Sequence, residues 1–170
     1  LTKVKNQNIS LEVLGTGNLK EQMQKFAEVN NINHMINWHG SVPRDQVMKL
    51  LSSAHLHVLT SLTEANTTVI WEAMASGVPS MALDHCGMHD IICENCGIKI
   101  PIDSYENVVN GIAEKLDFYN DNRNELEKLS KGVAVCAQKY RWSERIKFWE
   151  DMYDLAIENH AGKNKHSYMH

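Results

Sequence analysis

The stretch that decides the fold is residues 56–83, which read LHVLTSLTEANTTVIWEAMASGVPSMAL. Residues 56–60 alternate like a strand, and a polar stretch then leads to a helix expected over residues 68–76. Gly77 is expected to end that helix, because glycine accepts the left-handed conformation common at helical carboxyl termini. Residues 78–83 form an apolar run typical of a buried strand. The stretch therefore predicts a strand, a helix and a second strand, the unit from which parallel sheets are built.

The same alternation continues on both sides of this unit. Asn18 is expected to cap one helix, and Pro43 suits the first turn of another. This order of elements predicts an α/β fold with a parallel sheet covered by helices on both faces. The further strands are expected at 11–14, 36–40 and 98–101, and the further helices up to about residue 30, from 43 onward, and at 90–93, 104–118, 122–139 and 142–159.

Length and composition restrict the class of protein. The 170 residues suit one domain of ordinary size, and 43% hydrophobic with 22% charged residues indicates a globular chain. The net charge of -4 argues against a nucleic-acid surface, which needs clustered Lys and Arg. No apolar run approaches the length that crosses a bilayer. We expect one domain over residues 1–159 in a cytoplasmic protein, and a frayed or disordered tail over 160–170.

The four cysteines are too few and too unevenly spaced for a disulfide framework in a chain of this size. They are expected to be reduced thiols, as in a cytosolic protein. A zinc-stabilised regulatory domain is an alternative, because thiols and imidazoles gather in one stretch and could form a tetrahedral site. The stretch contains His85, Cys86, His89, Cys93 and Cys96.

Two glutamates with seven residues between them carry the clearest chemical signal. Glu64 lies in the loop before the helix, and Glu72 lies inside the helix. The N–H groups of Asn66, Thr67 and Thr68 at the helix start lack helical partners, and such groups bind phosphates. The two carboxylates can accept hydrogen bonds from sugar hydroxyls on either side of a diphosphate. This pattern predicts a site for a nucleotide sugar.

Other loops are expected beside this site, because ligands of parallel α/β sheets bind beyond the carboxyl ends of the strands. Gly15 and Gly17 suit either a ligand contact or a plain turn with positive φ. His39 either orients near the base of a nucleotide or simply ends its strand. The expected site loops are 15–18, 39–42 and 60–68.

The residues around Glu72 resemble the donor-binding signature of retaining GT-B-fold glycosyltransferases of the group 1, family 4 type. That signature has two glutamates with this spacing, followed by motifs like Ala-Met-Ala at 73–75 and Gly-Val-Pro at 77–79. The resemblance implies a Rossmann-like doubly wound sheet and a catalytic role for Glu64 at the transferred sugar. It further implies that Glu72 binds the ribose and that loop amides bind the diphosphate and the base. The implied donor-binding residues are Gly15, Gly17, His39, Gly40, Ser41, Val42, Asn66, Thr67, Thr68 and Glu72.

The chain departs from the family pattern at several points. Ala65-Asn66-Thr67 replaces the usual Gly-Phe-Gly, and Cys86-Gly87 replaces a pair of glycines. Fewer glycines limit how closely the backbone can approach a ligand. The resemblance covers about residues 11–157 and implies that the first strand and helix of the donor domain, and the acceptor domain, are missing. The missing strand is central in the usual order, so the fragment alone is expected to be inactive.

The resemblance implies transfer of a sugar, with retention, from a uridine or guanosine diphosphate sugar to a glycan or lipid-linked acceptor. No cofactor and no metal are expected, and the acceptor is expected to bind the missing amino-terminal domain. Bacterial polysaccharide synthesis at the inner face of the membrane, with peripheral association of the full-length protein, is the implied setting. The alternatives are a non-catalytic module that binds nucleotides or phosphosugars, and a nucleotide-sugar epimerase.

Overall fold

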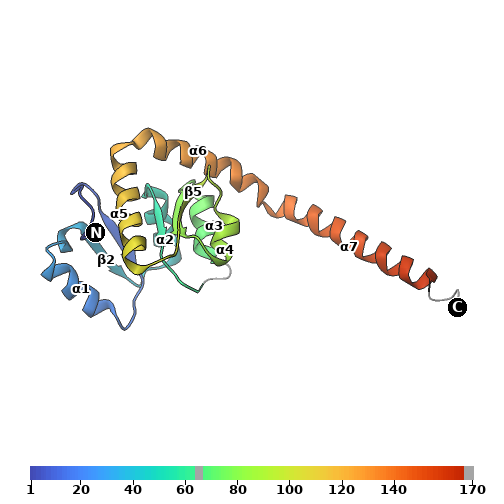
Figure 1. Ribbon diagram of the computed structural model, residues 1–170, viewed down its shortest axis with the longest axis horizontal. Coiled ribbons are helices and arrows are strands. Elements are labelled where there is room, and N and C mark those ends of the chain that lie inside the picture. The colour runs from blue at the N-terminus through green and yellow to red at the C-terminus, as the bar shows by residue number, and fades with distance from the viewer. Residues whose placement is uncertain (64–66, 167–170) are drawn as a thin grey trace. The chain divides into compact units, whose positions relative to one another are not determined.

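The computed structural model describes residues 1–63 and 67–166 of the chain (Figure 1). The contacts within the chain divide it into two units, residues 1–134 and 135–170, and each is described by itself. The boundary lies inside a helix, whereas we predicted a boundary at residue 159. The strands are β1 (Leu11–Leu14), β2 (Ile36–Gly40), β3 (His57–Leu59), β4 (Ser80–Leu83) and β5 (Gly97–Ile100). The helices are α1 (Lys20–Val29), the 3-10 helix η1 (Asn33–Met35), α2 (Arg44–Ser53), α3 (Thr68–Ala75), α4 (Cys86–Ile91), α5 (Tyr105–Asp121), α6 (Arg123–Lys139) and α7 (Trp142–His166).

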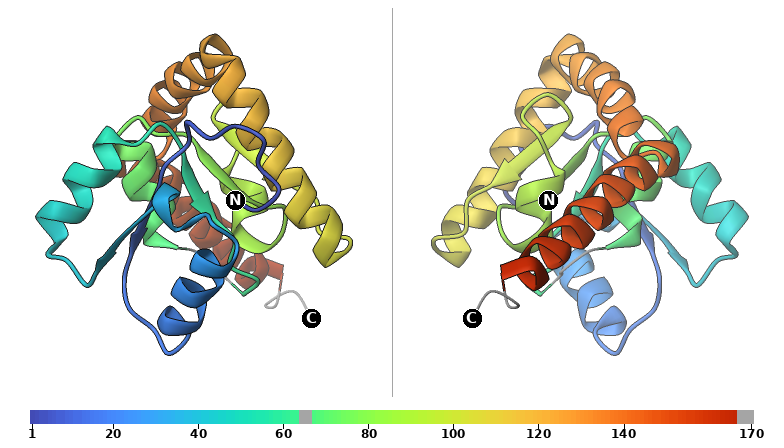
Figure 2. Two further views of the ribbon diagram at one scale, coloured as in Figure 1. Left: turned by 90° about the vertical axis from the view of Figure 1, so that its left-hand side faces the viewer. Right: turned by 90° about the vertical axis from the view of Figure 1, so that its right-hand side faces the viewer.

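The strands pair in parallel, which confirms the predicted α/β class. They form two sheets, β1-β2 and β3-β4-β5, and no strand within residues 1–63 and 67–166 joins them. The resemblance implies a strand between β1 and β3, at the position where the sheets are divided. In both views of Figure 2, α2 and α5 lie on opposite sides of the three-stranded sheet, as a doubly wound arrangement requires.

The core of the first unit lies on the three-stranded sheet. All four residues of β4 are buried, because this strand is hydrogen-bonded on both sides and covered on both faces. Leu126 and Leu129 of α6 pack against Met81, Leu83 and Ile98. Half-buried residues of α5 complete this layer. The carboxyl ends of the strands are thus fixed to a rigid core.

Residues 1–10 form turns and contain no helix. The N–H groups of Lys5 and Asn6 donate to the carboxylate of Asp117 on α5, at 3.0–3.1 Å. The Asn6 side chain donates to Asp121 one turn later, at 3.1 Å. These hydrogen bonds attach the first residues to the helix layer of the core.

The predicted cap of α1 is wrong. The helix begins at Lys20, and Leu19 at the cap position has helical dihedral angles and no side-chain cap hydrogen bond. The N–H of Lys20 donates to the carbonyl of Gly17 at 3.1 Å. A turn over residues 17–20 therefore leads into the helix, and Asn18 lies inside that turn.

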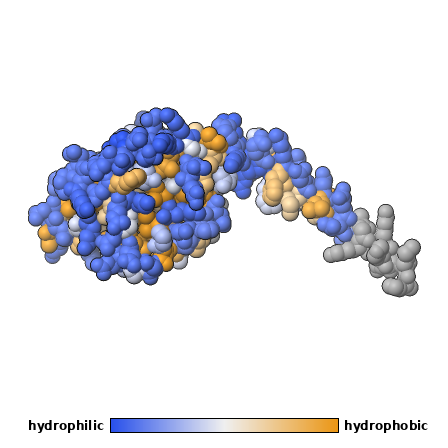
Figure 3. All heavy atoms as spheres, turned by 45° about the horizontal axis from the view of Figure 1, so that its top comes forward, coloured by the Kyte–Doolittle hydropathy of each residue, from blue (hydrophilic) through white to orange (hydrophobic). Residues whose placement is uncertain are grey.

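The second unit contains the end of α6 and α7. α7 continues to His166, into the stretch 160–170 for which a frayed or disordered tail was predicted. One glycine inside a helix costs only about 1 kcal/mol relative to alanine, so Gly162 does not end it. Trp142, Trp149 and Tyr153 of α7 are exposed. Figure 3 shows hydrophobic residues at the surface of this helix. A helix buries its apolar side only against another element, and this unit contains little besides α7.

Within the part of the chain that the structure describes, no helix combines the length and the apolar character needed to span a bilayer.

Candidate functional site

The loops after β1 and β2 are joined by a hydrogen bond at the carboxyl ends of the two strands. The N–H of Gly15 donates to the carbonyl of Gly40 at 2.7 Å. Gly15 and Gly40 have φ of 107° and 68°, a region that favours glycine. Gly15 thus has the positive φ of the plain-turn alternative, whereas the φ of Gly17 lies outside that region. The hydrogen bond brings two of the predicted site loops side by side.

The side chain of His39 contacts a carboxylate on the neighbouring strand. Its Nε2 lies 2.5 Å from Oε2 of Glu12, and the amide of Asn37 donates to Oε1 at 2.7 Å. These hydrogen bonds lower the pKa of the Glu12 carboxyl, because both stabilise its charged form. The sequence analysis missed Glu12. The parallel register that places Glu12 opposite Asn37 would have indicated it.

A positive charge lies beside the loop after β2. Nζ of Lys20 is 3.8 Å from the position that a Cβ on Gly40 would occupy, so the glycine leaves space for the ammonium group. Ser41, the next residue, is exposed, and Val42 is partly buried. Lys20 was not predicted as a site residue, because it lies on a helix outside the motif.

The loop after β2 is connected to α3 by an ion pair. Nη2 of Arg44 lies 2.7 Å from Oε1 of Glu72, and the side chains are 79% and 16% exposed. The guanidinium can therefore move to a ligand, while the carboxylate is held on the helix. Sequence analysis predicted Glu72 and missed Arg44. Its place at the start of a helix after the predicted base-contacting loop was the available signal.

The amino end of α3 carries part of the predicted phosphate site. The helix starts at Thr68, and Thr67 at the cap position is buried and makes no side-chain cap hydrogen bond. The first N–H groups of α3 are thus not satisfied by a capping side chain, which suits an anion. Glu64 and Asn66 lie outside the residues that the structure describes, so their predicted roles stay predictions.

The loop after β4 contacts the loop after β3. Nε2 of His85 lies 2.9 Å from the carbonyl oxygen of Ser61, and Nδ1 lies 2.9 Å from Sγ of Cys86. Cys86 has φ of 49°, a left-handed conformation that is costly for residues with a Cβ. It occupies a position where the resemblance places a glycine. Cys86 therefore carries backbone strain that a glycine at this position would not.

Two of the five predicted ligands of the alternative zinc site contact other groups. His85 contacts Ser61, and His89 contacts the carboxylate of Asp84 at 2.7 Å. Within the described ranges 1–63 and 67–160, no three of the five predicted ligands gather as a candidate metal group.

The contacts form a continuous path along the carboxyl ends of the strands. It runs from Gly15 to Gly40, and from Arg44 to Glu72 on α3. Lys20 and Arg44 provide positive charge on this path. Backbone N–H groups and two flanking cations can together hold a diphosphate, while Glu72 offers an acceptor for hydroxyl groups.

The family model described as glycosyl transferases group 1 matches residues 1–133, well over half of the chain. This chain belongs to that family. Among relatives, the uncharacterised glycosyltransferase MJ1607 of Methanocaldococcus jannaschii is 24% identical over 156 residues, covering 91% of this chain and 39% of that protein. The D-inositol 3-phosphate glycosyltransferase of Streptomyces griseus is 24% identical over 147 residues, covering 86% of this chain and 30% of that protein. The chain thus spans well under half the length of these group 1 relatives.

Solved structures confirm the predicted fold. The pneumococcal O-GlcNAc transferase GtfA, in complex with UDP and GlcNAc, matches with a TM-score of 0.72 at 18% identity, over 87% of this chain and 29% of that one. Anabaena HepE in complex with UDP matches with a TM-score of 0.75 at 14% identity, over 90% of this chain and 43% of that one. The fold of this group 1 chain is the carboxyl-terminal Rossmann-like domain of GT-B glycosyltransferases.

Proposed function

We propose that this chain is the donor-binding part of a retaining glycosyltransferase that uses a nucleotide-diphosphate sugar. The observation that carries the proposal is the ion pair between Arg44 and Glu72, beside an α3 amino end without a side-chain cap. A carboxylate beside a diphosphate is tolerable only when its charge is compensated, and Arg44 supplies that compensation. The ion pair thus offsets the repulsion between the Glu72 carboxylate and a bound diphosphate.

The proposed donor lies along the path of site contacts. The diphosphate accepts hydrogen bonds from the first N–H groups of α3. Glu72 accepts hydrogen bonds from the ribose hydroxyls, and the backbone of residues 39–42 contacts the base. Lys20 and Arg44 offset the charge that develops on the leaving nucleotide diphosphate. Glu64 is proposed to contact the transferred sugar.

The remaining parts of the proposal rest on family membership. We propose hexosyl transfer to a glycan or a lipid-linked acceptor, and an amino-terminal domain that holds the acceptor. The enzyme is proposed to need no resident metal or cofactor. Its proposed setting is polysaccharide synthesis in the cytoplasm of a bacterium, with peripheral association of the whole protein at the inner face of the membrane.

Calorimetric titration tests the donor site in this chain. The ligands are UDP-glucose and GDP-mannose, with the free nucleosides as reference. Glu72→Gln and Arg44→Gln are each expected to weaken binding of these nucleotide sugars about ten- to a hundredfold, because a lost hydrogen bond to a charged group costs about 1.5–3 kcal/mol. Glu127→Gln is the matched control, since Glu127 pairs with Lys131 on α6 at 2.7 Å. Equal affinity in all variants would refute the site.

Transfer is tested in a chain that also contains an acceptor domain. We expect sugar transfer that Glu64→Gln and Glu72→Gln strongly reduce, and a product with the anomeric configuration of the donor, measured by NMR. Binding without any transfer would support the non-catalytic module instead. Inversion at the anomeric carbon would contradict retention.

A further inference from the structure

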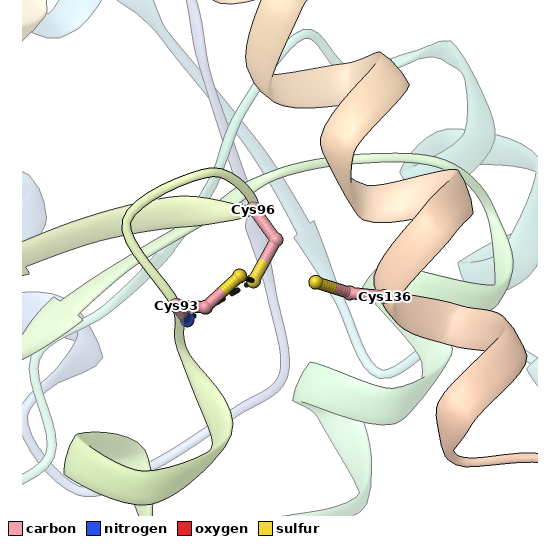
Figure 4. A group of neighbouring side chains, drawn as sticks. All are labelled: Cys93, Cys96 and Cys136. Carbon is pink, nitrogen blue, oxygen red and sulfur yellow. Dashed lines mark hydrogen bonds between the residues drawn. The ribbon is translucent and has the colours of Figure 1, made fainter.

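Two cysteines meet in the turn between α4 and β5, which the proposed donor site does not use. The N–H of Cys96 donates to the carbonyl of Cys93 at 3.0 Å, which closes a four-residue turn. The N–H of Cys93 donates to Sγ of Cys96 at 3.0 Å, and the two Sγ atoms are 2.6 Å apart. Figure 4 shows the two sulfur atoms facing each other; Cys136, also drawn, belongs to the second unit.

Zinc binding and disulfide formation are the two reactions open to this pair. Two thiolates on one tetrahedral zinc ion, at about 2.3 Å each, are held roughly 3.8 Å apart. A disulfide needs about 2.05 Å and Cα atoms about 4.4–6.8 Å apart, which a closed turn provides. The two sulfur atoms form a hydrogen-bonded pair in a closed turn, a geometry from which a disulfide can form. We propose that Cys93 and Cys96 are a redox site, a dithiol that low-molecular-weight disulfides convert reversibly into a disulfide within the turn.

The packing around the turn holds the pair in this geometry. A Cβ on Gly97 would lie 2.4 Å from the carbonyl oxygen of Ser80, so the strand after the turn is pressed against β4. A Cβ on Gly132 of α6 would lie 1.7 Å from the carbonyl oxygen of Asn95, inside the turn. The backbone of the turn is thus confined on two sides, which keeps Cys93 and Cys96 next to each other.

The two cysteines differ in access, which assigns their roles. Cys93 is partly exposed, whereas Cys96 is buried at 4% exposure. The Cys93 thiolate attacks oxidised glutathione, forms a mixed disulfide and releases one glutathione thiolate. The Cys96 thiolate then attacks Sγ of Cys93 and releases the second glutathione. In total, two protein thiols lose two electrons and two protons, and one glutathione disulfide is reduced to two thiols.

The site lies at the opposite end of β5 from the donor loops. Cys96 directly precedes Gly97, the first residue of β5, which pairs with Ser80 at the start of β4. The proposed donor residues follow the carboxyl ends of the strands. Oxidation is therefore expected to leave nucleotide binding unchanged, so this inference and the proposed function can fail independently.

The test uses a chain in which Cys86 and Cys136 are replaced by serine, which leaves only this pair. The chain is equilibrated in glutathione buffers of decreasing reducing power, quenched in acid and weighed by mass spectrometry. We expect loss of two hydrogen atoms without an added glutathione, and restoration by dithiothreitol. In the same background, Cys96→Ser is expected to retain one glutathione on Cys93, because the resolving thiol is absent.

Several outcomes would overturn the inference. These are a persistent glutathione adduct on the chain with both cysteines, or a stoichiometric zinc ion that protects both thiols from alkylation. If the double-serine chain does not fold, peptide mapping of the oxidised natural sequence decides the question. A cross-link within residues 93–96 supports the inference, and links from either cysteine to Cys86 or Cys136 refute it.

Discussion

The β1-β2 part and the β3-β4-β5 part of the first unit have the same sequence pattern and differ in packing. β4 is buried along its whole length, whereas β1 has no buried residue. The apolar side chains of Leu19 at the cap position of α1 and of Met23 and Phe26 on α1 are 52–59% exposed. Together with residues of β1 and β2 they line a hollow of about 520 Å³. A strand and an amphipathic helix make a core only when further layers cover them.

The two parts of the unit thus differ in role: one forms most of the core, and the other contributes loops to the candidate site. The three-stranded part is covered by α5 and α6 and holds most of the buried side chains. The two-stranded part contributes the loops of Gly15 and Gly40 to the candidate site. We therefore expect substitutions in the three-stranded part to change the free energy of unfolding much more than those in the two-stranded part.

The largest effect is expected for Gly132→Ala. The new Cβ would lie 1.7 Å from a backbone oxygen, which cannot move without shifting the turn. We expect a loss of about 3 kcal/mol or more in the free energy of unfolding, measured by urea denaturation. Gly111→Ala is the matched helical control, since its Cβ would contact Ile100 at an ordinary 3.6 Å, and it is expected to stabilise by about 0.5–1 kcal/mol.

The same substitution in the two-stranded part completes this comparison. A Cβ on Gly17 would meet nothing within 4 Å. Gly17→Ala is therefore expected to change the free energy of unfolding by no more than about 0.5 kcal/mol. A large loss in the free energy of unfolding for Gly17→Ala, or no loss for Gly132→Ala, would contradict the difference in packing between the two-stranded and three-stranded parts.

Truncation of strand residues should follow the same division. Met81 on β4 is 1% exposed, so Met81→Ala is expected to cost about 2–5 kcal/mol through lost contacts and a cavity. Val13 on β1 is only half-buried, and Val13→Ala is expected to cost about 1 kcal/mol or less. Both variants are measured by thermal and urea denaturation. Equal losses in the free energy of unfolding for Met81→Ala and Val13→Ala would mean that the two parts share one core.

Acid should destabilise the three-stranded part through His57. Burial lowers the pKa of this imidazole below 6.5 in the folded state, so the unfolded state binds more protons near and below pH 6.5. Stability is therefore expected to fall as the pH falls through 6.5 toward the folded pKa. In melting experiments from pH 7 to 5, the free energy of unfolding is plotted against pH. His57→Gln should reduce the slope of this plot by up to about 1.4 kcal/mol per pH unit.

A histidine of the two-stranded part is the control for this titration. His34 is exposed on η1, and His34→Gln is the matched substitution at an exposed position. The amide of Gln at position 57 can still reach Oγ of Ser80, which lies 3.0 Å from Nδ1 of His57. An unchanged slope in His57→Gln would show that its burial does not couple folding to pH.

The smallest effect concerns the two non-glycine residues with positive φ among those described. Cys86 and Asn31 have φ of 49° and 53°. Cys86→Gly should stabilise by about 0.5–1 kcal/mol, because the left-handed conformation costs a side chain about 1–2 kcal/mol and glycine entropy offsets part of the gain. Asn31→Gly should be nearly neutral, since Asn tolerates this region. Differential scanning calorimetry measures the melting temperatures of both variants. Equal shifts in melting temperature for Cys86→Gly and Asn31→Gly would disprove strain at Cys86.

The sequence by itself determined the order and type of the elements in this protein. Apolar periodicity predicted β2 with its observed ends, and Gly77 ended α3 within a residue of the expected position. The motif around Glu72 indicated the family that the chain belongs to. These features depend on residues within a few turns of one another, so local propensity and pattern are enough to reveal them.

Only the tertiary structure decided which side chains meet. The pairs Arg44–Glu72 and Glu12–His39 join segments far apart in the sequence, and no periodicity predicts them. The division into two sheets and the exposure of the apolar side of α1 also depend on which layers cover each strand. Contacts of this kind are set by the packing of the whole unit, because the position of each loop depends on the strand beneath it.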